Sequence, residues 1–299
     1  MVKMNLPNTM IIGASKSATT SLYDLLKNHE NIFAPSFKEP HFFNFDDNFS
    51  KGLDWYSKTY FSRVRKEHII LDCTPTYLYS KNTPERIFNS LGNNMKFIVV
   101  VRNPVDRAYS HFLHSKRDGL EKLKFSEALE NESSRLIEAQ NNNDFLSELR
   151  FSYIAQGMYF NMLSNYLEFY SMDNFLILDF DNDIKNDFTS GLRKISKFLN
   201  LNISSINTGF HSNKSSKARF PFLKNILKSK GFFRRMAKKI VFSTQTRQRL
   251  KNKINRLNEK EHSFSKLSHE LKSSLMRRYF NEDISLLESL INEQKNWNN

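Results

Sequence analysis

The sequence lacks the residues and runs that typify several classes of protein. It has a single cysteine, Cys73, which excludes an internal disulfide framework and a cysteine-rich metal site. No stretch reaches the roughly 18 consecutive apolar residues that a membrane-spanning helix needs. Residues 1–16 lack the apolar core of a signal peptide, so we expect none. A lone cysteine without these export and membrane signals fits a reducing compartment.

Acidic residues are almost missing from one segment of an otherwise balanced chain. Residues 211–260 hold sixteen Lys or Arg and one acidic residue, Glu259. The whole chain carries a net charge of +14 and this segment carries +15, so the remaining residues sum to −1. We predict peripheral contact of 211–260 with an anionic membrane or glycan. For its amphipathic part at 226–242, a surface helix docked on the core is the alternative.

A strand, a loop and a helix follow one another at the beginning of the chain. An apolar run at 10–12 leads into Gly13, a polar loop follows at 14–20, and a helical pattern begins at Ser21. Main-chain N–H groups at such a helix start bind phosphate, and the helix dipole favours the anion. The alternative is an ordinary turn with a solvated lysine. The candidate anion ligands are Lys16, Ser17, Ala18, Thr19, Thr20 and Ser21.

An acid, a base and a histidine occur close together in an aromatic-rich stretch. The segment at 38–43 reads KEPHFF and contains Lys38, Glu39 and His41. A carboxylate among Phe side chains is partly desolvated, which raises its pKa toward the range that suits a general base. The alternative is a surface Lys–Glu pair beside a histidine that is buried for packing.

Two later strands end in polar residues. The apolar run at 69–71 is followed by DCTPTYL, in which Asp72, Thr74 and Tyr77 are candidate ligands, although capping and packing explain each of them equally well. The run at 97–101 is followed by RNPVDRAYS. Its Arg102 lies at the strand end and its Ser110 on the helix that Pro104 opens, so the pair predicts a phosphate site.

The remaining pattern predicts an α/β fold. A helix begins near Thr83, an amphipathic segment covers 153–170, a strand covers 175–180, and helices cover 187–199 and 268–297. Apolar strands that alternate with helices indicate a central parallel sheet flanked by helices. We expect one domain over 1–299, with the basic segment 211–260 inside it.

Taken together, these motifs resemble sulfotransferases that use 3′-phosphoadenosine-5′-phosphosulfate (PAPS), of the glycosaminoglycan or carbohydrate type. The loop at 13–22 resembles their phosphosulfate loop, which often has Gly where this chain has Ala18. KEPHFF resembles the segment with their proposed base, and RNPVDRAYS resembles their 3′-phosphate motif. Asp72 replaces the family's usual Glu. The resemblance implies the P-loop, nucleoside-kinase-like sulfotransferase fold.

The resemblance also implies roles for individual residues. Lys16 stabilises the leaving phosphate, and its loop binds the phosphosulfate. Glu39 is the general base, with Lys38 and His41 beside it. Arg102 and Ser110 bind the 3′-phosphate. Asp72, Thr74 and Tyr77 lie on the acceptor side, and a loop at 210–217 closes over the nucleotide through Lys214 and Lys217.

The implied reaction moves a sulfuryl group from PAPS to a hydroxyl or amine of a saccharide or glycolipid, leaving adenosine 3′,5′-bisphosphate. No metal is required. The composition, rich in Asn, Lys, Phe and Ser, favours a bacterial cytoplasmic enzyme over one of the Golgi, with contact at the inner membrane face through 211–260. Two alternatives remain: a kinase of the same fold that uses ATP, and a basic protein that binds nucleic acid or membrane. The near absence of Tyr and Trp from 211–260 argues against nucleic acid.

Overall fold

The computed structural model describes residues 4–202, 216–218, 259–261, 267–295 and 297. Its centre is a five-stranded parallel sheet in the order β2-β3-β1-β4-β5, which confirms the predicted fold class. The strands are short and nearly all of their residues are buried, as expected for a parallel sheet covered on both faces. They are β1 (Thr9–Gly13), β2 (Ile32–Phe33), β3 (Ile69–Cys73), β4 (Lys96–Val101) and β5 (Phe175–Asp179).

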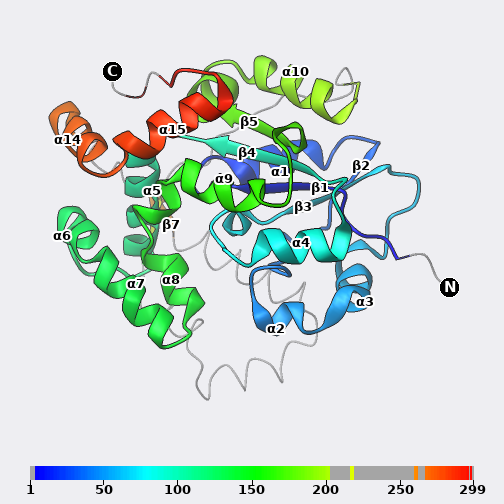
Figure 1. The fold of residues 1–299 in the computed structure, drawn as a ribbon, viewed down its shortest axis with the longest axis horizontal. Helices are drawn as coiled ribbons and strands as arrows, with labels where there is room; N and C mark the ends of the chain where they lie inside the picture. Colours follow the sequence, from blue (N-terminus) through cyan, green and yellow to red (C-terminus); the bar gives the residue numbers. More distant parts are fainter. Residues whose placement is uncertain (1–3, 203–215, 219–258, 262–266, 296, 298–299) are drawn as a thin grey trace.

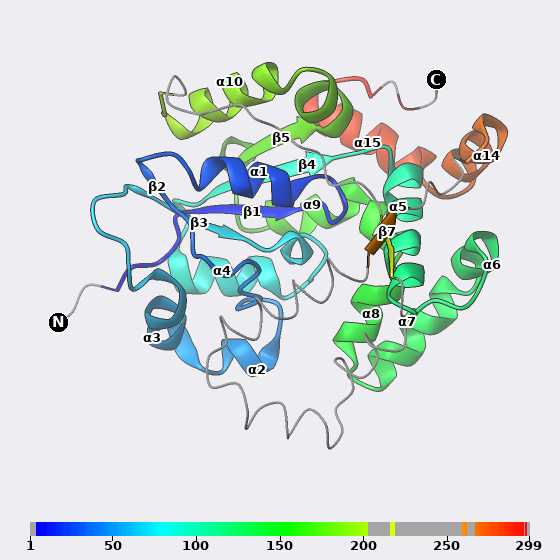
Figure 2. The same ribbon diagram turned by 180° about the vertical axis from the view of Figure 1, so that it is seen from behind.

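Alternation along the strands builds two separate cores. Ile11, Ile98 and Val100 join the core that is completed by α1 (Thr19–Leu26) and α10 (Phe188–Leu199). Met10, Ile12, Phe97 and Val99 belong to the core on the other face, which α4 (Thr83–Leu91) and α9 (Tyr159–Leu167) cover. Figure 1 shows α4 and α9 in front of the sheet, and Figure 2 shows α1 in front of it from the opposite side.

The strand order places a crevice at one edge of the sheet. β1 lies between β3 and β4, and α4 carries the chain from β3, on one side of β1, to β4 on the other. Open α/β sheets bind ligands at such a switch point, outside the carboxyl ends of the strands. The loop after β1 and the helix α5 (Pro104–Arg117) after β4 both begin at this edge.

Further helices surround the sheet. The side chain of Asn103 accepts from the N–H groups of Val105 and Asp106 and so caps α5. The helix expected to begin near Thr83 is α4, whose first residue is Thr83, and Asn82 precedes it without a side-chain cap. The other helices are α2 (Asp46–Phe49), α3 (Gly52–Tyr56), α6 (Phe125–Glu130), α7 (Glu132–Asn141), α8 (Phe145–Phe151), α14 (His269–Tyr279) and α15 (Asn281–Ile291).

The prediction of a single helix over 268–297 is wrong. The helical stretch is interrupted at Phe280, which lies between α14 and α15. Phe280 is buried and packs against Gly157, where a Cβ would lie only 2.8 Å from its ring. Gly157 also adjoins Pro104 at the start of α5. Asn103 donates from its side chain to the carbonyl of Trp297 at 2.9 Å. The C-terminal residues therefore pack on the beginning of α5.

Part of the predicted basic region can be placed. Ser216–Ala218 (β6) pairs antiparallel with Glu259–Glu261 (β7), so Lys217 belongs to a strand where a loop was expected. Lys214 and the amphipathic stretch at 226–242 lie outside the described residues. Contact of 211–260 with a membrane or glycan stays a prediction. Within the described ranges, no helix combines the length and apolar character that crossing a bilayer requires.

Candidate active site

The loop after β1 has the tight geometry that its small residues allow. A Cβ on Gly13 would lie 2.6 Å from Leu78 Cδ2, so the close approach of these two segments needs glycine. Lys16 and Ala18 have φ of 72° and 58°, in the left-handed region. Ala18 immediately precedes α1 and makes no side-chain cap. The loop therefore turns sharply and presents the first N–H groups of α1.

A cavity of about 860 Å³ lies at this edge of the sheet. Its walls come from the loop after β1, from Pro75 and Thr76 beyond β3, from Arg102 beyond β4 and from Phe180 beyond β5. Eight residues predicted from separate motifs line this one cavity: Lys16, Ala18, Thr19, Thr20, Ser21, Glu39, Arg102 and Ser110. The structure thus joins the predicted phosphate loop, the predicted base and the predicted 3′-phosphate pair.

Positive charge is concentrated around Lys16. Burial and the guanidinium groups of Arg117 and Arg102 lower the pKa of Lys16 to about 8, with Asp118 opposing them. Among the described residues, Lys16 Nζ makes no hydrogen bond or ion pair, and the buried Ser17 Oγ has no hydrogen-bond partner. An anion in the cavity would pair with the ammonium group of Lys16 and raise its pKa again. The residues present therefore fit the phosphosulfate end of PAPS.

Arg102 is held in place by three contacts. Its Nη1 donates to the carbonyl of Lys16 at 2.9 Å, and its guanidinium lies 4.5 Å from the ring centre of Phe180. The Tyr159 hydroxyl donates to the Arg102 carbonyl at 2.8 Å and accepts from its N–H at 3.3 Å. Ser110 lies two helical turns along α5 in the same cavity. A guanidinium fixed in this way suits bidentate recognition of a phosphate.

Glu39 lies in a small hydrogen-bonded cluster. Its Oε2 is 3.2 Å from His41 Nε2, its Oε1 is 3.6 Å from Lys38 Nζ, and Lys38 Nζ donates to Thr20 Oγ1 at 2.8 Å. Burial acts to raise the pKa of Glu39, but His41 and Lys38 outweigh it, so this pKa lies below its ordinary value. The raised pKa expected from the sequence is therefore wrong. The carboxyl keeps its charge because its two basic neighbours stabilise it.

The predicted acceptor-side residues form a buried network. Asp72 has no exposed surface and accepts from the hydroxyls of Tyr56, Thr74 (2.8 Å) and Tyr77 (3.1 Å). Burial raises the pKa of Asp72. The Tyr77 hydroxyl also accepts from the N–H groups of Phe42 and Phe43 at 2.9 and 3.3 Å. Through these two hydrogen bonds, the network supports the segment that carries Glu39 and His41.

Several lining residues were not predicted. His114 and Arg117 line the cavity four and seven residues after Ser110, so all three share one face of α5. This helical spacing was a signal in the sequence. Phe180 and Gln156 also line the cavity, and only the fold brings them there. Of the predicted residues, Lys38 and His41 contact Glu39 and do not line the cavity, while the side chain of Ser17 is buried within the loop.

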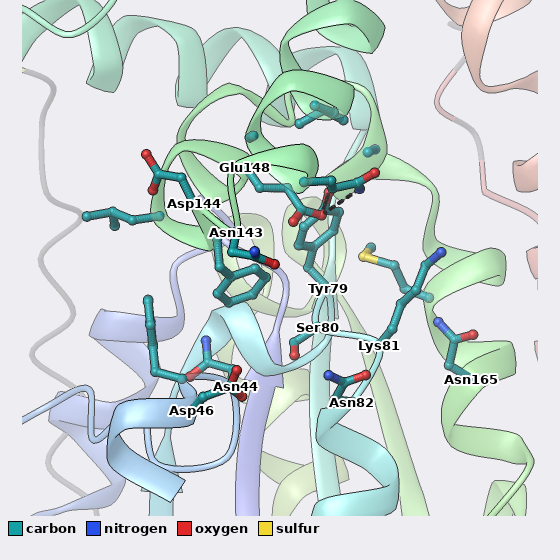
Figure 3. A pocket seen from close by; sticks show the side chains of 18 of the residues that line it. Asn44, Asp46, Tyr79, Ser80, Lys81, Asn82, Asn143, Asp144, Glu148 and Asn165 are labelled. Atoms are coloured by element: carbon teal, nitrogen blue, oxygen red, sulfur yellow. Dashed lines mark hydrogen bonds between the residues drawn. The ribbon is translucent and has the colours of Figure 1, made fainter. Parts of the chain in front are cut away.

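A second cavity, of about 880 Å³, lies beside the first. Figure 3 shows its side chains approaching from the segments at 44–46, 79–82, 143–148 and from Asn165. Asn44, in its wall, donates to Thr76 Oγ1 at 2.9 Å, and Thr76 lines the first cavity. Within the described residues, no three His, Cys, Asp or Glu are grouped to hold a metal.

Comparisons with known proteins agree with this architecture. A sulfotransferase from Alicyclobacillus acidocaldarius superposes with a TM-score of 0.67 over 99% of this chain and 100% of its own, at 22% identity. Heparan sulfate glucosamine 3-O-sulfotransferase 3B1 of Mus musculus is 31% identical over 221 residues, or 73% of this chain and 52% of its own length. The mouse 3-O-sulfotransferase 5 is 29% identical over 69% of this chain and 58% of its own length.

The chain thus spans about half the length of the curated relatives that it matches. The family model named Sulfotransferase domain matches residues 6–286, which include the β1 loop, Glu39, the end of β4 and both cavities. From its sequence and its fold, this chain belongs to the sulfotransferase domain family.

Proposed function

We propose that this protein transfers a sulfuryl group from PAPS to a hydroxyl, or an amine, of a saccharide. One observation carries the proposal: Lys16, Glu39, Arg102 and Ser110 line a single cavity at the carboxyl edge of the sheet. PAPS, when bound, supplies the activated sulfuryl group. The named relatives that act on heparan sulfate support a saccharide as the acceptor.

In this proposal the donor is held at both ends. Arg102 and Ser110 bind the 3′-phosphate and so select PAPS over ATP. The N–H groups at the start of α1, with Thr19, Thr20 and Ser21, bind the 5′ end. Lys16 stabilises the charge that develops on the leaving phosphate, in a buried site where such an interaction is strong. Lys214 and Lys217 remain predicted contacts to the nucleotide.

Glu39 is the proposed general base. Its lowered pKa keeps it ionised at neutral pH, and it can therefore accept a proton from an acceptor placed in line with the sulfur. His41 and Lys38 hold its two carboxylate oxygens. Asp72, Thr74 and Tyr77 act in this scheme by supporting the segment at 38–43.

Thermal unfolding with nucleotides tests the proposal. A ligand at 100 times its dissociation constant adds about 2.7 kcal/mol to the free energy of unfolding. We expect adenosine 3′,5′-bisphosphate to stabilise the wild-type protein more than ATP does, and to lose this effect in Arg102→Ala. Arg278→Ala is the matched control, because its exposed side chain lies away from the cavity and makes a 3.9 Å ion pair with Glu130 and a contact with the Tyr279 ring.

A larger shift with ATP, or none with the bisphosphate, would overturn the proposal and favour the ATP-dependent kinase. The first loop has no Gly-Lys-Ser/Thr sequence, which argues against that kinase.

A further inference from the structure

The second cavity shares no lining residue with the cavity proposed to bind the donor, and side-chain contacts connect its wall to Glu39, which makes it a place for the acceptor. Asn44 in its wall donates to Thr76 Oγ1, and that oxygen lies 3.3 Å from His41 Nδ1. His41 Nε2 in turn lies 3.2 Å from Glu39. One chain of side-chain contacts therefore runs from the wall of the second cavity to the proposed base.

Carboxamide side chains dominate the polar lining of this cavity. Each offers a donor and an acceptor, as does a sugar hydroxyl, so the two kinds of group match. Figure 3 shows Asn44, Asn82, Asn143 and Asn165 around the space. The carboxamides that line it are Asn44, Asn82, Asn143, Asn161, Asn165 and Gln140.

Aromatic rings add apolar surface to the same cavity. Phe45 and Phe145 contribute from opposite segments and meet edge to face, with ring centres 5.3 Å apart. Tyr79 lines the cavity and donates to Glu148 at 2.9 Å. Amide groups around a few aromatic faces give a site for a molecule that has both hydroxyls and apolar CH surfaces.

The charge of the lining is the informative feature. Among the described residues, the lining has two basic side chains, Lys81 and Arg86, and Arg86 is paired with Asp46. Four carboxylates line the same space: Asp46, Asp47, Asp144 and Glu148. Carboxylates thus outnumber cations, and a polyanion would meet charge of its own sign here.

We propose that this cavity binds the acceptor as an uncharged saccharide chain, with its hydroxyl groups on the carboxamides and one ring near Glu39. The inference rests on the proposed sulfotransferase function. It separates this chain from its relatives that act on heparan sulfate, an acceptor that already carries anionic groups.

Two hexasaccharides that differ in charge test the inference. Chitohexaose is built from uncharged N-acetylglucosamine, whereas a heparosan hexasaccharide alternates the same sugar with glucuronate. Sulfation of each is measured with PAPS, and binding of each is measured by calorimetry in the presence of adenosine 3′,5′-bisphosphate. We expect the KM for chitohexaose to be at least about tenfold lower, which corresponds to 1.4 kcal/mol.

Two asparagines allow a matched set of variants. Among the described residues, the side chains of Asn82 and Asn165 make no hydrogen bond. We therefore expect the fold to stay intact when these side chains are removed. The double variant Asn82→Ala/Asn165→Ala should raise the KM for chitohexaose about thirtyfold, since it loses two hydrogen bonds worth about 1 kcal/mol each. Asn142→Ala is the control, because Asn142 bonds to Glu138 on α7 and does not line the cavity.

The outcomes separate the two proposals. If the bisphosphate does not bind, the sulfotransferase function fails, and this inference fails with it. If the bisphosphate binds but heparosan is preferred, or if neither saccharide binds, the function stands and the uncharged acceptor is wrong. An unchanged KM in the double variant would also contradict the placement of the acceptor.

Discussion

The guanidinium of Arg102 donates to the main-chain carbonyl of Lys16 at 2.9 Å, which joins the end of β4 to the loop after β1. The two segments lie 86 residues apart in the sequence and both line the first cavity, which is the proposed site of the donor PAPS. A change in either segment therefore affects the geometry of the other.

The pKa of Lys16 predicts how donor binding depends on pH. Burial, Arg117 and Arg102 lower this pKa to about 8, so Lys16 loses its proton as the pH rises through 8. The bisphosphate is fully ionised above about pH 7, since phosphate has its second pKa near 6. We expect its dissociation constant to be flat up to pH 7.5 and then to rise by up to about tenfold for each pH unit, measured by calorimetry.

Lys16→Arg provides the control for this experiment, because arginine keeps its charge throughout the range. Its dissociation constant should show no rise between pH 8 and 9.5. A wild-type protein with equally flat binding over that range would contradict the role given to the Lys16 charge.

Glu39 should affect chemistry and leave donor binding unchanged. Removal of a general base typically costs 10²- to 10⁴-fold in rate, so we expect Glu39→Gln to lower kcat by about that factor. Its dissociation constant for the bisphosphate should stay within about twofold of wild type. Steady-state kinetics together with calorimetry separates the two effects, and parallel losses in both would argue that Glu39 positions the donor.

His41 should set the acid limb of the pH–rate profile. His41 and Lys38 hold the pKa of Glu39 below its ordinary value of 4.5. Glu39 therefore becomes protonated, and the enzyme loses its proposed base, only as the pH falls below 4.5. His41→Ala removes one of these two partners, so burial raises the pKa of Glu39 against Lys38 alone. We therefore expect the acid limb of kcat/KM to move to higher pH. An unmoved limb would show that another group controls it.

Asp72 is expected to act through stability. Its carboxylate accepts from three buried hydroxyls, and Asp72→Ala would leave them without an acceptor. We expect a loss on the order of 3 kcal/mol in the free energy of unfolding, measured in urea. Asp54→Ala, which removes an exposed carboxylate paired with Lys58, should change it by less than about 0.5 kcal/mol.

The milder Asp72→Asn separates support from direct contact with the acceptor. If Asp72 only supports the segment at 38–43, this variant should lose stability while the KM for the acceptor changes by less than about threefold. A large change in KM at unchanged stability would instead return Asp72 to the acceptor site.

Ala18 should gain stability on replacement by glycine. Its φ of 58° is unfavourable for a residue with a Cβ, at a cost of about 1 to 2 kcal/mol, which exceeds the entropy that glycine adds to the unfolded chain. We expect Ala18→Gly to raise the free energy of unfolding by about 0.5 to 1 kcal/mol. Ala139→Gly, inside the helix α7, should lower it by about 1 kcal/mol. A loss in both variants would contradict the strain at Ala18.

Local pattern predicted which residues after β1 and β4 come together, but not the contacts of Glu39. The loop at 14–20 and Arg102 each follow directly on a buried apolar strand, and Ser110 lies on the helix that begins after Arg102, so the parallel sheet brings them to one cavity. The lowered pKa of Glu39 depends on the fold of 38–41, which places His41 and Lys38 on its two oxygens. Sequence shows that these residues are neighbours but not which of them the carboxylate contacts.

The second cavity could not be predicted from the sequence. Its walls come from helices and loops, and their relative positions do not follow from the ends of the strands. Phe280 illustrates the same limit at the C-terminus. The helical pattern continues through this residue, and only the space above Gly157 explains why the chain bends there.

The packing of Phe280 and Trp297 on the start of α5 bears on how the protein can be shortened. Trp297 accepts a hydrogen bond from Asn103, and Phe280 packs against Gly157, which adjoins Pro104. Asn103 and Pro104 begin the same helix that carries Ser110 and Arg117 into the first cavity. A truncation before residue 280 would remove the surface against which that helix start is held. We therefore expect shortened versions of this chain to lose the position of α5, and with it the proposed nucleotide binding, before they lose the central sheet.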